Sequence, residues 1–282
     1  MSAYRFCRTD DIPLLVDAWN RCSLPHVPGT PPLTVAAFKQ EIRELDLWCS
    51  SCMVAFDGKE PIGVMIGCKR PPQTLVHRIA VHPDHLRQGH ARHMLTSLSA
   101  KLAILGPPIL VAELPAENSA ARALFKACGW REERTYVDYL AESPVAAPAP
   151  PGLVVPVTVG DLADIALPAA DAPRSWERSR ATLLARSERL FGLAITHGDR
   201  LDASILYARE EDRNVVWNLS ASVGDAGRGA VGVLLRELAH RHRVPIAIPR
   251  LEANELDAAV PQDQRLVPGG ATIRVTAAAR AA

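Results

Sequence analysis

The sequence predicts an α/β protein made of two mixed-sheet domains, each with helices on both faces of its sheet. Three observations support this fold class. The chain has 282 residues, of which 48% are hydrophobic, which is enough for two modest packed cores. A segment rich in proline and alanine divides the chain at 143–152. On each side of this segment, strand-like and helix-like runs follow one another in the same order.

The first half begins with a predicted strand at 4–7, and the helix cap Thr9-Asp10-Asp11 follows it. Further along, Asp57-Gly58-Lys59 separates two apolar runs, and this pattern predicts a β-hairpin. Pro83 and a glycine-containing turn then separate an apolar strand from a helix. We expect strands at 4–7, 52–56, 61–68, 75–81, 109–113 and 134–140, and helices at 12–22, 33–45, after the turn at 86–91, and at 119–127.

The second half repeats this order. We expect strands at 153–157, 190–196, 201–208, 215–221 and 244–248, and helices at 161–166 and 229–240. Residues offset by 140 match without gaps around the turn: Ile79 with Leu219, Gly89 with Gly229, and Leu95 with Leu235. We therefore expect two copies of one α/β unit.

The segment at 143–152 is expected to be an extended linker, because proline fixes φ and removes a hydrogen-bond donor. The predicted domains are 1–142 and 153–282. The second copy is expected to pack against the first and to close the substrate cleft or replace a dimer partner. This gives either a monomer with pseudo-dimeric halves or a homodimer.

Charge and hydropathy exclude several classes of partner. The formal net charge is +1, so no global field attracts nucleic acid or an anionic membrane. The first residues contain no apolar signal core, and no apolar run is long enough to span a bilayer. We expect a cytoplasmic protein.

The cysteines and histidines are expected to play no part in metal binding. All six cysteines precede residue 130, and Cys49-Ser-Ser-Cys52 has no second pair that would complete a zinc site. We expect unrelated reduced thiols; a redox protein is the alternative, in which Cys49→Ser abolishes activity. Five histidines crowd one segment but are divided among strand, turn and helix: His77, His82, His85, His90 and His93.

The turn after the strand at 75–81 has the features of an anion site. Its residues run from Leu86 through Gly89 to Ala91 and lead into a helix, whose first amides have no intrahelical partner. Gly89 and Ala91 remove side-chain bulk, and Arg87 and Arg92 add positive charge. This pattern predicts a cradle for a diphosphate.

Two motifs carry a family resemblance. Ala80-Val81-His82-Pro83, followed by Leu86-x-x-Gly89-x-Ala91, resembles the acyl-CoA signature of the GNAT superfamily of N-acetyltransferases. The run Asn118-x-x-Ala121-x-x-Leu124-Phe125-x-x-x-Gly129-Trp130 resembles the family's second element. Two linked motifs in the right order are more specific than a glycine-rich turn alone. One departure is Leu86, which stands where the family has Arg or Gln.

The resemblance implies two GNAT-like domains, with acetyl-CoA as co-substrate and an amine of a small molecule or peptide as acceptor. It implies that the turn amides bind the pyrophosphate, that the strand before the turn pairs with the pantetheine arm, and that Asn118 also contacts this arm. The acceptor is expected between the second helix, the final strands and the second copy. The implied cofactor-binding residues are Ile79, Ala80, Val81, Arg87, Gln88, Gly89, His90, Ala91, Arg92, Asn118 and Phe125.

The second copy is expected to be degenerate. It has no counterpart of the Asn118 motif, and Val231 stands at the position of Ala91, where its branched side chain would intrude on a diphosphate. The alternative is a second anion site formed by Gly227, Arg228 and Gly229.

The catalytic groups are less clear from the sequence. Phe125 occupies the position of a family Tyr whose hydroxyl donates to the sulfur, so this general acid is absent. Tyr136 and Tyr139 are alternative acids, and His77 and Glu113 are candidate bases. A water relay, or no enzymic base, remains open. A catalytically silent CoA-binding or scaffold protein is the competing function.

Overall fold

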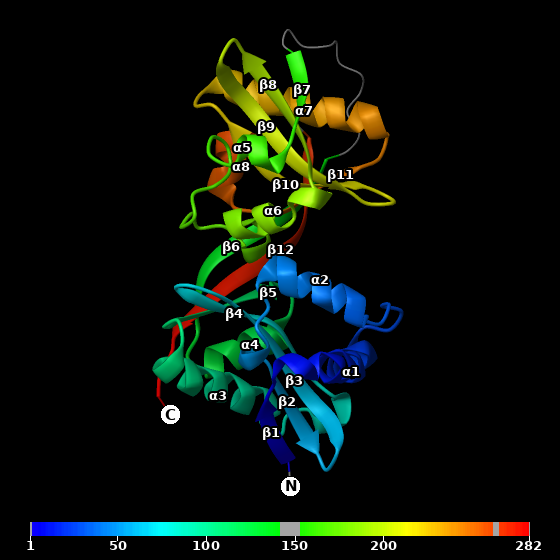
Figure 1. Cartoon of the computed structure of the whole chain (residues 1–282), viewed down its shortest axis with the longest axis vertical. Helices are drawn as coiled ribbons and strands as arrows, with labels where there is room; N and C mark the ends of the chain where they lie inside the picture. Colours follow the sequence, from blue (N-terminus) through cyan, green and yellow to red (C-terminus); the bar gives the residue numbers. More distant parts are fainter. Residues whose placement is uncertain (1, 142–152, 262–264, 282) are drawn as a thin grey trace. The chain divides into compact units, whose positions relative to one another are not determined.

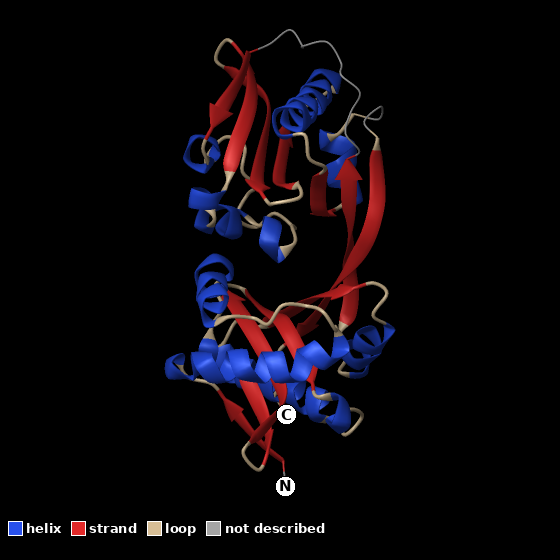
Figure 2. Ribbon diagram, turned by 90° about the vertical axis from the view of Figure 1, so that its right-hand side faces the viewer, coloured by secondary structure: helices blue, strands red, loops and turns tan. Residues whose placement is uncertain are grey.

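The computed structural model describes residues 2–141, 153–261 and 265–281. The chain divides into two compact units: Met1–Glu133 with Ile273–Ala282, and Arg134–Thr272. In each unit, helices cover both faces of a mixed sheet, as Figures 1 and 2 show, so the predicted fold class is confirmed. The predicted linker at 143–152 lies outside the described residues.

The first unit is built on a mixed sheet with strand order β1-β2-β3-β4-β5, followed by the end of β12. The pairs from β1 to β4 are antiparallel, whereas β4 and β5 are parallel. Its elements are β1 (Ser2–Phe6), α1 (Ile12–Ser23), α2 (Val35–Leu45), β2 (Met53–Asp57), β3 (Glu60–Arg70), β4 (Gln73–Val81), α3 (His90–Leu105), β5 (Ile109–Pro115), α4 (Ser119–Ala127) and the end of β12 (Leu266–Ala278).

The core of the first unit lies between the sheet and the pair α3 and α4. Met94 and Leu98 from α3 and Phe125 from α4 are buried there together with Ile273 and Val275 from β12. On the opposite face, α1 packs on β3 and β4 and also contacts α2 (Figure 1). Both faces of β3 and β4 are therefore covered, and this explains their long apolar runs.

The second unit has the strand order β12-β6-β11-β10-β9-β8-β7. Its elements are β6 (Arg131–Ala141), β7 (Leu153–Val157), α5 (Val159–Leu162), α6 (Arg180–Ala185), β8 (Phe191–His197), β9 (Arg200–Arg209), β10 (Asn214–Ala221), α7 (Asp225–His242), β11 (Ile246–Leu251), α8 (Ala253–Ala259) and the start of β12. Successive residues of β9 face opposite layers: Ile205 packs with α7, and Leu206 packs with α5 and α6.

The last strand of the chain was not predicted. Residues Pro268, Gly269 and Gly270 near the start of β12 are typical of loops, so the sequence pattern there is weak. The later residues alternate, with Ile273 and Val275 buried in the first unit. β12, red in Figure 1, begins in the second unit and ends in the first.

Three helices begin earlier or later than the sequence suggested. α2 begins at Val35 because the side chain of Thr34 accepts from the amide of Ala37 and caps it. α5 begins at Val159, where Thr158 and Asp161 form a capping box. α7 begins at Asp225 rather than at 229, one turn earlier than predicted. None of the helices in the described ranges is long and apolar enough to cross a membrane.

A candidate acyl-CoA groove in the first unit

A β-bulge at His77 opens the sheet. Ile66 pairs with Arg78 and Gly67 pairs with Val76, so His77 is an extra residue on β4. The parallel pairing of β4 with β5 ends at Val76, immediately before the bulge. Because a bulge bends its strand, the remainder of β4 diverges from β5.

This divergence leaves one edge of β4 without a neighbouring strand. The amide of His82 donates to Ile62 of the β3 side, at 2.9 Å, so even-numbered residues here direct their main-chain groups toward β3. The main-chain groups of Ile79 and Val81 therefore point to the opposite side, where β5 has moved away. An extended ligand that carries amides can pair with this edge as an added strand.

The turn after β4 presents main-chain donors. Arg87 and Gly89 both have left-handed backbone conformations, with φ of 62° and 88°. The first hydrogen bond of α3 runs from the amide of His93 to the oxygen of Gly89, at 2.9 Å. The amides of His90, Ala91 and Arg92 thus have no intrahelical acceptor, and the positive end of the helix dipole lies beside them. This arrangement suits an anion.

The open edge and the turn line one groove of about 910 Å³. A Cβ added at Gly89 would meet no atom within 4 Å, so the direction in which a side chain would extend from Gly89 is open space. The residues that line the groove are Trp19, Ser23, His26, Val27, Ile79, Ala80, Val81, His85, Leu86, Arg87, Gly89, His90, Ala91, Arg92, Asn118, Ala120, Ala121, Ala123, Leu124 and Ala127. Of the predicted cofactor-binding residues, only Gln88 and Phe125 are absent from this described lining.

The groove is positively charged at the turn. Arg87 and Arg92 line it, and its described lining contains no carboxylate. His90, the first residue of α3, is 5% exposed, and its Nδ1 lies 2.6 Å from the hydroxyl of Tyr4. Burial, with the neighbouring His85 and His93, lowers the pKa of His90, so its ring is neutral at neutral pH. A neutral ring suits the positive end of α3, where a cation would be repelled.

Asn118 lines the groove and caps α4. Its Oδ1 accepts from the amide of Ala121, at 2.9 Å.

We expect Asn118→Ala to lower the free energy of unfolding by about 1 kcal/mol and to weaken coenzyme A binding as well. Asn118→Ser, which can still cap, should restore stability but not affinity. Thr34→Ala, which removes the cap of α2, is the matched control: denaturation should show a similar loss and calorimetry an unchanged affinity.

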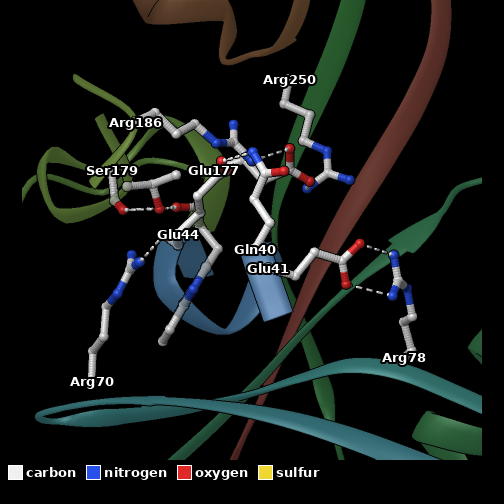
Figure 3. Close-up of polar contacts among 11 residues, drawn as sticks. Gln40, Glu41, Glu44, Arg70, Arg78, Glu177, Ser179, Arg186 and Arg250 are labelled. Carbon is white, nitrogen blue, oxygen red and sulfur yellow. Dashed lines mark hydrogen bonds and ion pairs between the residues drawn. The ribbon is translucent and has the colours of Figure 1, made fainter. Parts of the chain in front are cut away.

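The opposite wall of the groove comes from α1 and the 3₁₀ turn Leu24–His26. The guanidinium carbon of Arg78 lies 5.2 Å from the ring centroid of Trp19, a cation–π contact. Arg78 also donates two parallel hydrogen bonds, of 2.6 and 2.8 Å, to the carboxylate of Glu41 in α2 (Figure 3). This ion pair links α2 to the strand, and no α2 residue belongs to the described lining. The described wall thus comes from α1 and the turn after it, and the expected position of the acceptor beside α2 stays a prediction.

Phe125 is buried inside the first unit rather than exposed in the groove. Its side chain is 1% exposed and packs edge-to-face on Trp130, with ring centroids 4.8 Å apart. Helical spacing directs the neighbouring Leu124 toward the groove instead. A direct contact between Phe125 and a ligand stays a prediction. No hydroxyl is present at this position to protonate a leaving group.

The four predicted catalytic residues lie outside the described lining of the groove. His77 is the bulged residue of β4. Glu113 is directed at Arg274 of β12, 3.9 Å away, and its side chain is 4% exposed. Tyr136 and Tyr139 belong to the second unit, where Tyr136 is 1% exposed. Within the first unit, His77 and Glu113 therefore lie apart from the described lining, and the catalytic roles of all four residues stay predictions.

The corresponding turn in the second unit has become helix. α7 begins at Asp225 after Gly224, and the amide of Arg228 donates to Gly224 at 3.3 Å. A carboxylate therefore already occupies the positive end of the helix, and Arg228 forms an ion pair with it. A Cβ at Gly227 would lie 2.1 Å from the oxygen of Ser222, so this turn is tightly packed.

Two details of the predicted second copy are therefore wrong. Gly224, not Gly229, precedes the helix, although the core register is kept, with Leu95 and Leu235 both buried. Val231 does not intrude on an anion site but is buried in the core, because one more helical turn precedes it. In the second unit, the extra helical turn accepts hydrogen bonds from the amides whose counterparts at the start of α3 have no intrahelical acceptor.

The cysteines form no disulfide among the described residues. Burial raises the pKa of Cys7 to about 12 and that of Cys22 to about 11, so both are unreactive at neutral pH. Across the described residues no His, Cys, Asp and Glu side chains cluster closely enough to hold a metal ion.

The groove residues of the α1 wall were missed by sequence reasoning: Trp19, Ser23, His26 and Val27. They lie at least 46 residues before the start of β4 at Gln73, and no local pattern links them to it. The available signal was the loop Leu24-Pro25-His26 between two helices, since loops often carry functional side chains.

Comparison with known proteins supports the interpretation of this groove. Residues 15–130 match the model of the Acetyltransferase (GNAT) family. This segment contains every residue of the described groove lining, from Trp19 to Ala127. The first unit therefore belongs to the GNAT acetyltransferase family. No curated protein matches the chain in sequence.

Solved structures match both units together. A GCN5-related N-acetyltransferase from Sphaerobacter thermophilus is 15% identical, with a TM-score of 0.69, over 99% of this chain and 96% of the other. A tandem GNAT protein from the clavulanic acid biosynthesis pathway is 15% identical, with a TM-score of 0.66, over 99% of both chains. At this identity the likeness concerns the fold, which is that of tandem GNAT proteins.

Proposed function

We propose, from the premise that residues 15–130 form a GNAT domain, that the first unit transfers an acetyl group from acetyl-CoA to an amine of a small molecule or peptide. The observation that carries this proposal is that one groove joins the anion-binding turn to the open edge of β4. Acetyl-CoA is a diphosphate joined to an arm that contains amides and ends in a thioester. The groove offers donors for the diphosphate and a strand edge for the arm.

Each part of the proposed complex has a physical role. The amides of His90 and Ala91, together with the charge of Arg87 and Arg92, would hold the diphosphate. The edge at Ile79 and Val81 would hold the arm by main-chain hydrogen bonds. A main-chain N–H of this edge would also stabilise the negative charge that develops on the thioester oxygen. The bound thioester supplies an activated acetyl group.

Protonation of the leaving sulfur is assigned to water in this proposal. Phe125 has no hydroxyl, and Tyr136 and Tyr139 belong to the other compact unit. A thiolate is a stable leaving group that water can protonate, so a dedicated acid is not essential.

Calorimetry and turnover assays test the proposed function. Coenzyme A should bind one site per chain, and free thiol should be released from acetyl-CoA only when an amine is added. A KM for acetyl-CoA of about 1 µM to 1 mM is expected. Absence of coenzyme A binding would refute the proposal.

A catalytically silent CoA-binding protein is the alternative function. Phe125 and the exposed Leu86 favour it, because the family usually has a hydroxyl and a polar or basic side chain at these positions. Binding of coenzyme A without turnover of any amine in a broad panel would support the silent protein. Sustained release of thiol with a single amine would exclude it.

The roles of the two halves are part of the same proposal. In sequence, the proposed domains are 1–142 and 153–282, with 143–152 as linker. By packing, residues 134–141 belong to the second unit and Ile273–Ala282 to the first. The second unit is a degenerate copy without an acyl-CoA site, supported by the carboxylate of Asp225 at the start of α7. The free cysteines fit a reducing compartment, so we place the protein in the cytoplasm.

A further inference from the structure

The arm of acetyl-CoA has a defined direction in the proposed complex. The diphosphate is assigned to the turn after β4, so an arm that pairs with the open edge of β4 passes Val81 first and Ile79 later. The thioester and its acyl group therefore lie toward Ile79 and the bulge at His77. Of the described lining residues on β4, Ile79 is the one nearest this bulge, since neither His77 nor Arg78 belongs to the lining.

Two contacts show which part of the α1 wall faces the acyl end. The imidazole of His26, in the turn that follows α1, lies 2.9 Å from the main-chain oxygen of Val81, near the diphosphate. Further back along α1, the ring centroid of Trp19 lies 5.2 Å from the guanidinium carbon of Arg78, the residue before Ile79. α1 thus runs beside β4 in the same direction as the strand, with Trp19 toward the bulge.

The spacing of the lining residues agrees with this direction. One helical turn, about 6 Å, separates Trp19 from Ser23 on α1. Two strand residues, about 7 Å, separate Ile79 from Val81 on β4. Trp19 is also the first residue of α1 in the described lining. The indole of Trp19 therefore stands at the level of Ile79, where the acyl group is expected.

The indole of Trp19 is held in place. Ala18 and Cys22, on either side of it along α1, are fully buried, and α1 packs on β3 and β4. Arg78 lies against the indole and is itself fixed by two hydrogen bonds to Glu41 (Figure 3). A closely packed wall rejects a ligand that is too large, because added methylenes would force side chains out of their preferred rotamers.

This end of the groove suits a short acyl group without charge. The side chain of Ile79 is apolar, and the indole of Trp19 is apolar except for its N–H group. The positive charge of Arg78 is paired with Glu41, so it is not available to a carboxylate at the end of a dicarboxylic acyl group. The arginines of the described lining lie at the turn and at the start of α3, at the opposite end.

We infer that Trp19 sets the size limit for the acyl group, an inference that rests on the proposed acetyl transfer. Acetyl fits between the indole and Ile79, whereas the chain of a longer acyl group needs the space that the indole occupies. Trp19 takes no part in the transfer and acts only on which acyl-CoA is accepted. A single methylene changes selectivity in an apolar pocket by about 10- to 200-fold, which is enough to exclude a butyryl group.

The test compares acetyl-CoA with butyryl-CoA, using the amine that a broad panel identifies. We expect the wild type to have a kcat/KM about 100-fold lower for butyryl-CoA. In Trp19→Ala the two values should differ by less than about fivefold, because removal of the indole leaves a cavity for two more methylenes. Trp19→Leu keeps more of the apolar packing of α1 and should give an intermediate ratio. Trp48→Ala, which removes an exposed indole outside the described lining, is the matched control and should keep the wild-type ratio.

Calorimetry without an amine measures the same limit without turnover. The wild type should bind butyryl-CoA about tenfold more weakly than coenzyme A, which carries no acyl group. In Trp19→Ala the two dissociation constants should agree within about twofold. A general loss of stability would weaken both ligands together and leave their ratio unchanged, so the ratio reports the size limit alone.

Distinct outcomes would contradict the size limit and the proposed function. Unchanged acyl ratios in both Trp19 variants would overturn the role of Trp19. A changed KM for the amine with an unchanged acyl ratio would also overturn it, and would place Trp19 in the acceptor site instead. A wild-type protein that binds no coenzyme A would refute the proposed function itself.

Discussion

Replacement of Gly89 by leucine is expected to raise the dissociation constant of coenzyme A by about 30-fold or more, which corresponds to about 2 kcal/mol. Gly89 has a φ of 88° at the start of α3, and a Cβ there would project into open space beside the groove. A leucine side chain would occupy the space where the diphosphate must approach the amides of His90 and Ala91. It would also cost about 1–2 kcal/mol of stability, because left-handed backbone is unfavourable for residues other than glycine.

Gly58→Leu is the matched control for this experiment. Gly58 also has a positive φ, of 57°, and a Cβ there likewise meets no atom within 4 Å. It lies in the β2–β3 hairpin and is not among the groove-lining residues described for the first unit. Both variants should lose similar stability in urea, but only Gly89→Leu should lose affinity in calorimetry. Equal affinities for the two variants would show that the turn does not hold the diphosphate.

A chain that ends at Thr272 is expected to lose more than about 4 kcal/mol of stability in its first unit, a large share of the 5–15 kcal/mol typical of domains. The truncation removes Ile273 and Val275, which are 7% and 3% exposed in the core of that unit. It also removes Arg274, which donates to Glu133 at 3.0 Å and to Gln73 at 2.8 Å. Urea unfolding followed by the fluorescence of the buried Trp130 measures the loss.

Two point variants on β12 separate core packing from chain length. Ile273→Ala should cost about 2–4 kcal/mol, because it leaves a cavity in the core. Val267→Ala, on the same strand but 45% exposed, should change stability by less than about 0.5 kcal/mol. A truncated chain with an unchanged unfolding midpoint would contradict the assignment of residues 273–282 to the first core.

A fragment of residues 1–142 is expected to lose activity. Such a fragment lacks the end of β12, so its loss of activity would follow from an incomplete core and would say nothing about the second copy. Addition of a peptide of residues 266–282 is the informative comparison. Recovery of coenzyme A binding would then show that the first unit needs only this strand.

Local chemistry in the sequence was sufficient for most elements and for the turn that lines one side of the groove. Apolar strands, capping residues and Gly89 act through neighbours within a few positions, so their consequences can be inferred without the fold. This explains why the turn at 86–91, the cap at Asn118 and the alternation of strands and helices were predicted. α5 begins two residues earlier than predicted because Thr158 and Asp161 form a capping box, and α7 begins at Asp225 after Gly224, which makes no side-chain cap hydrogen bond.

The sequence by itself determined the fold class, the family resemblance and the turn whose amides at the start of α3 have no intrahelical acceptor. Tertiary structure alone decided that His26 meets Val81, which lies 55 residues away, that Glu113 faces Arg274, and that Phe125 is buried against Trp130. It also decided that the last strand completes the first core. These contacts depend on how distant segments meet across a sheet, and hydrophobic burial selects that meeting without leaving a local pattern in the chain.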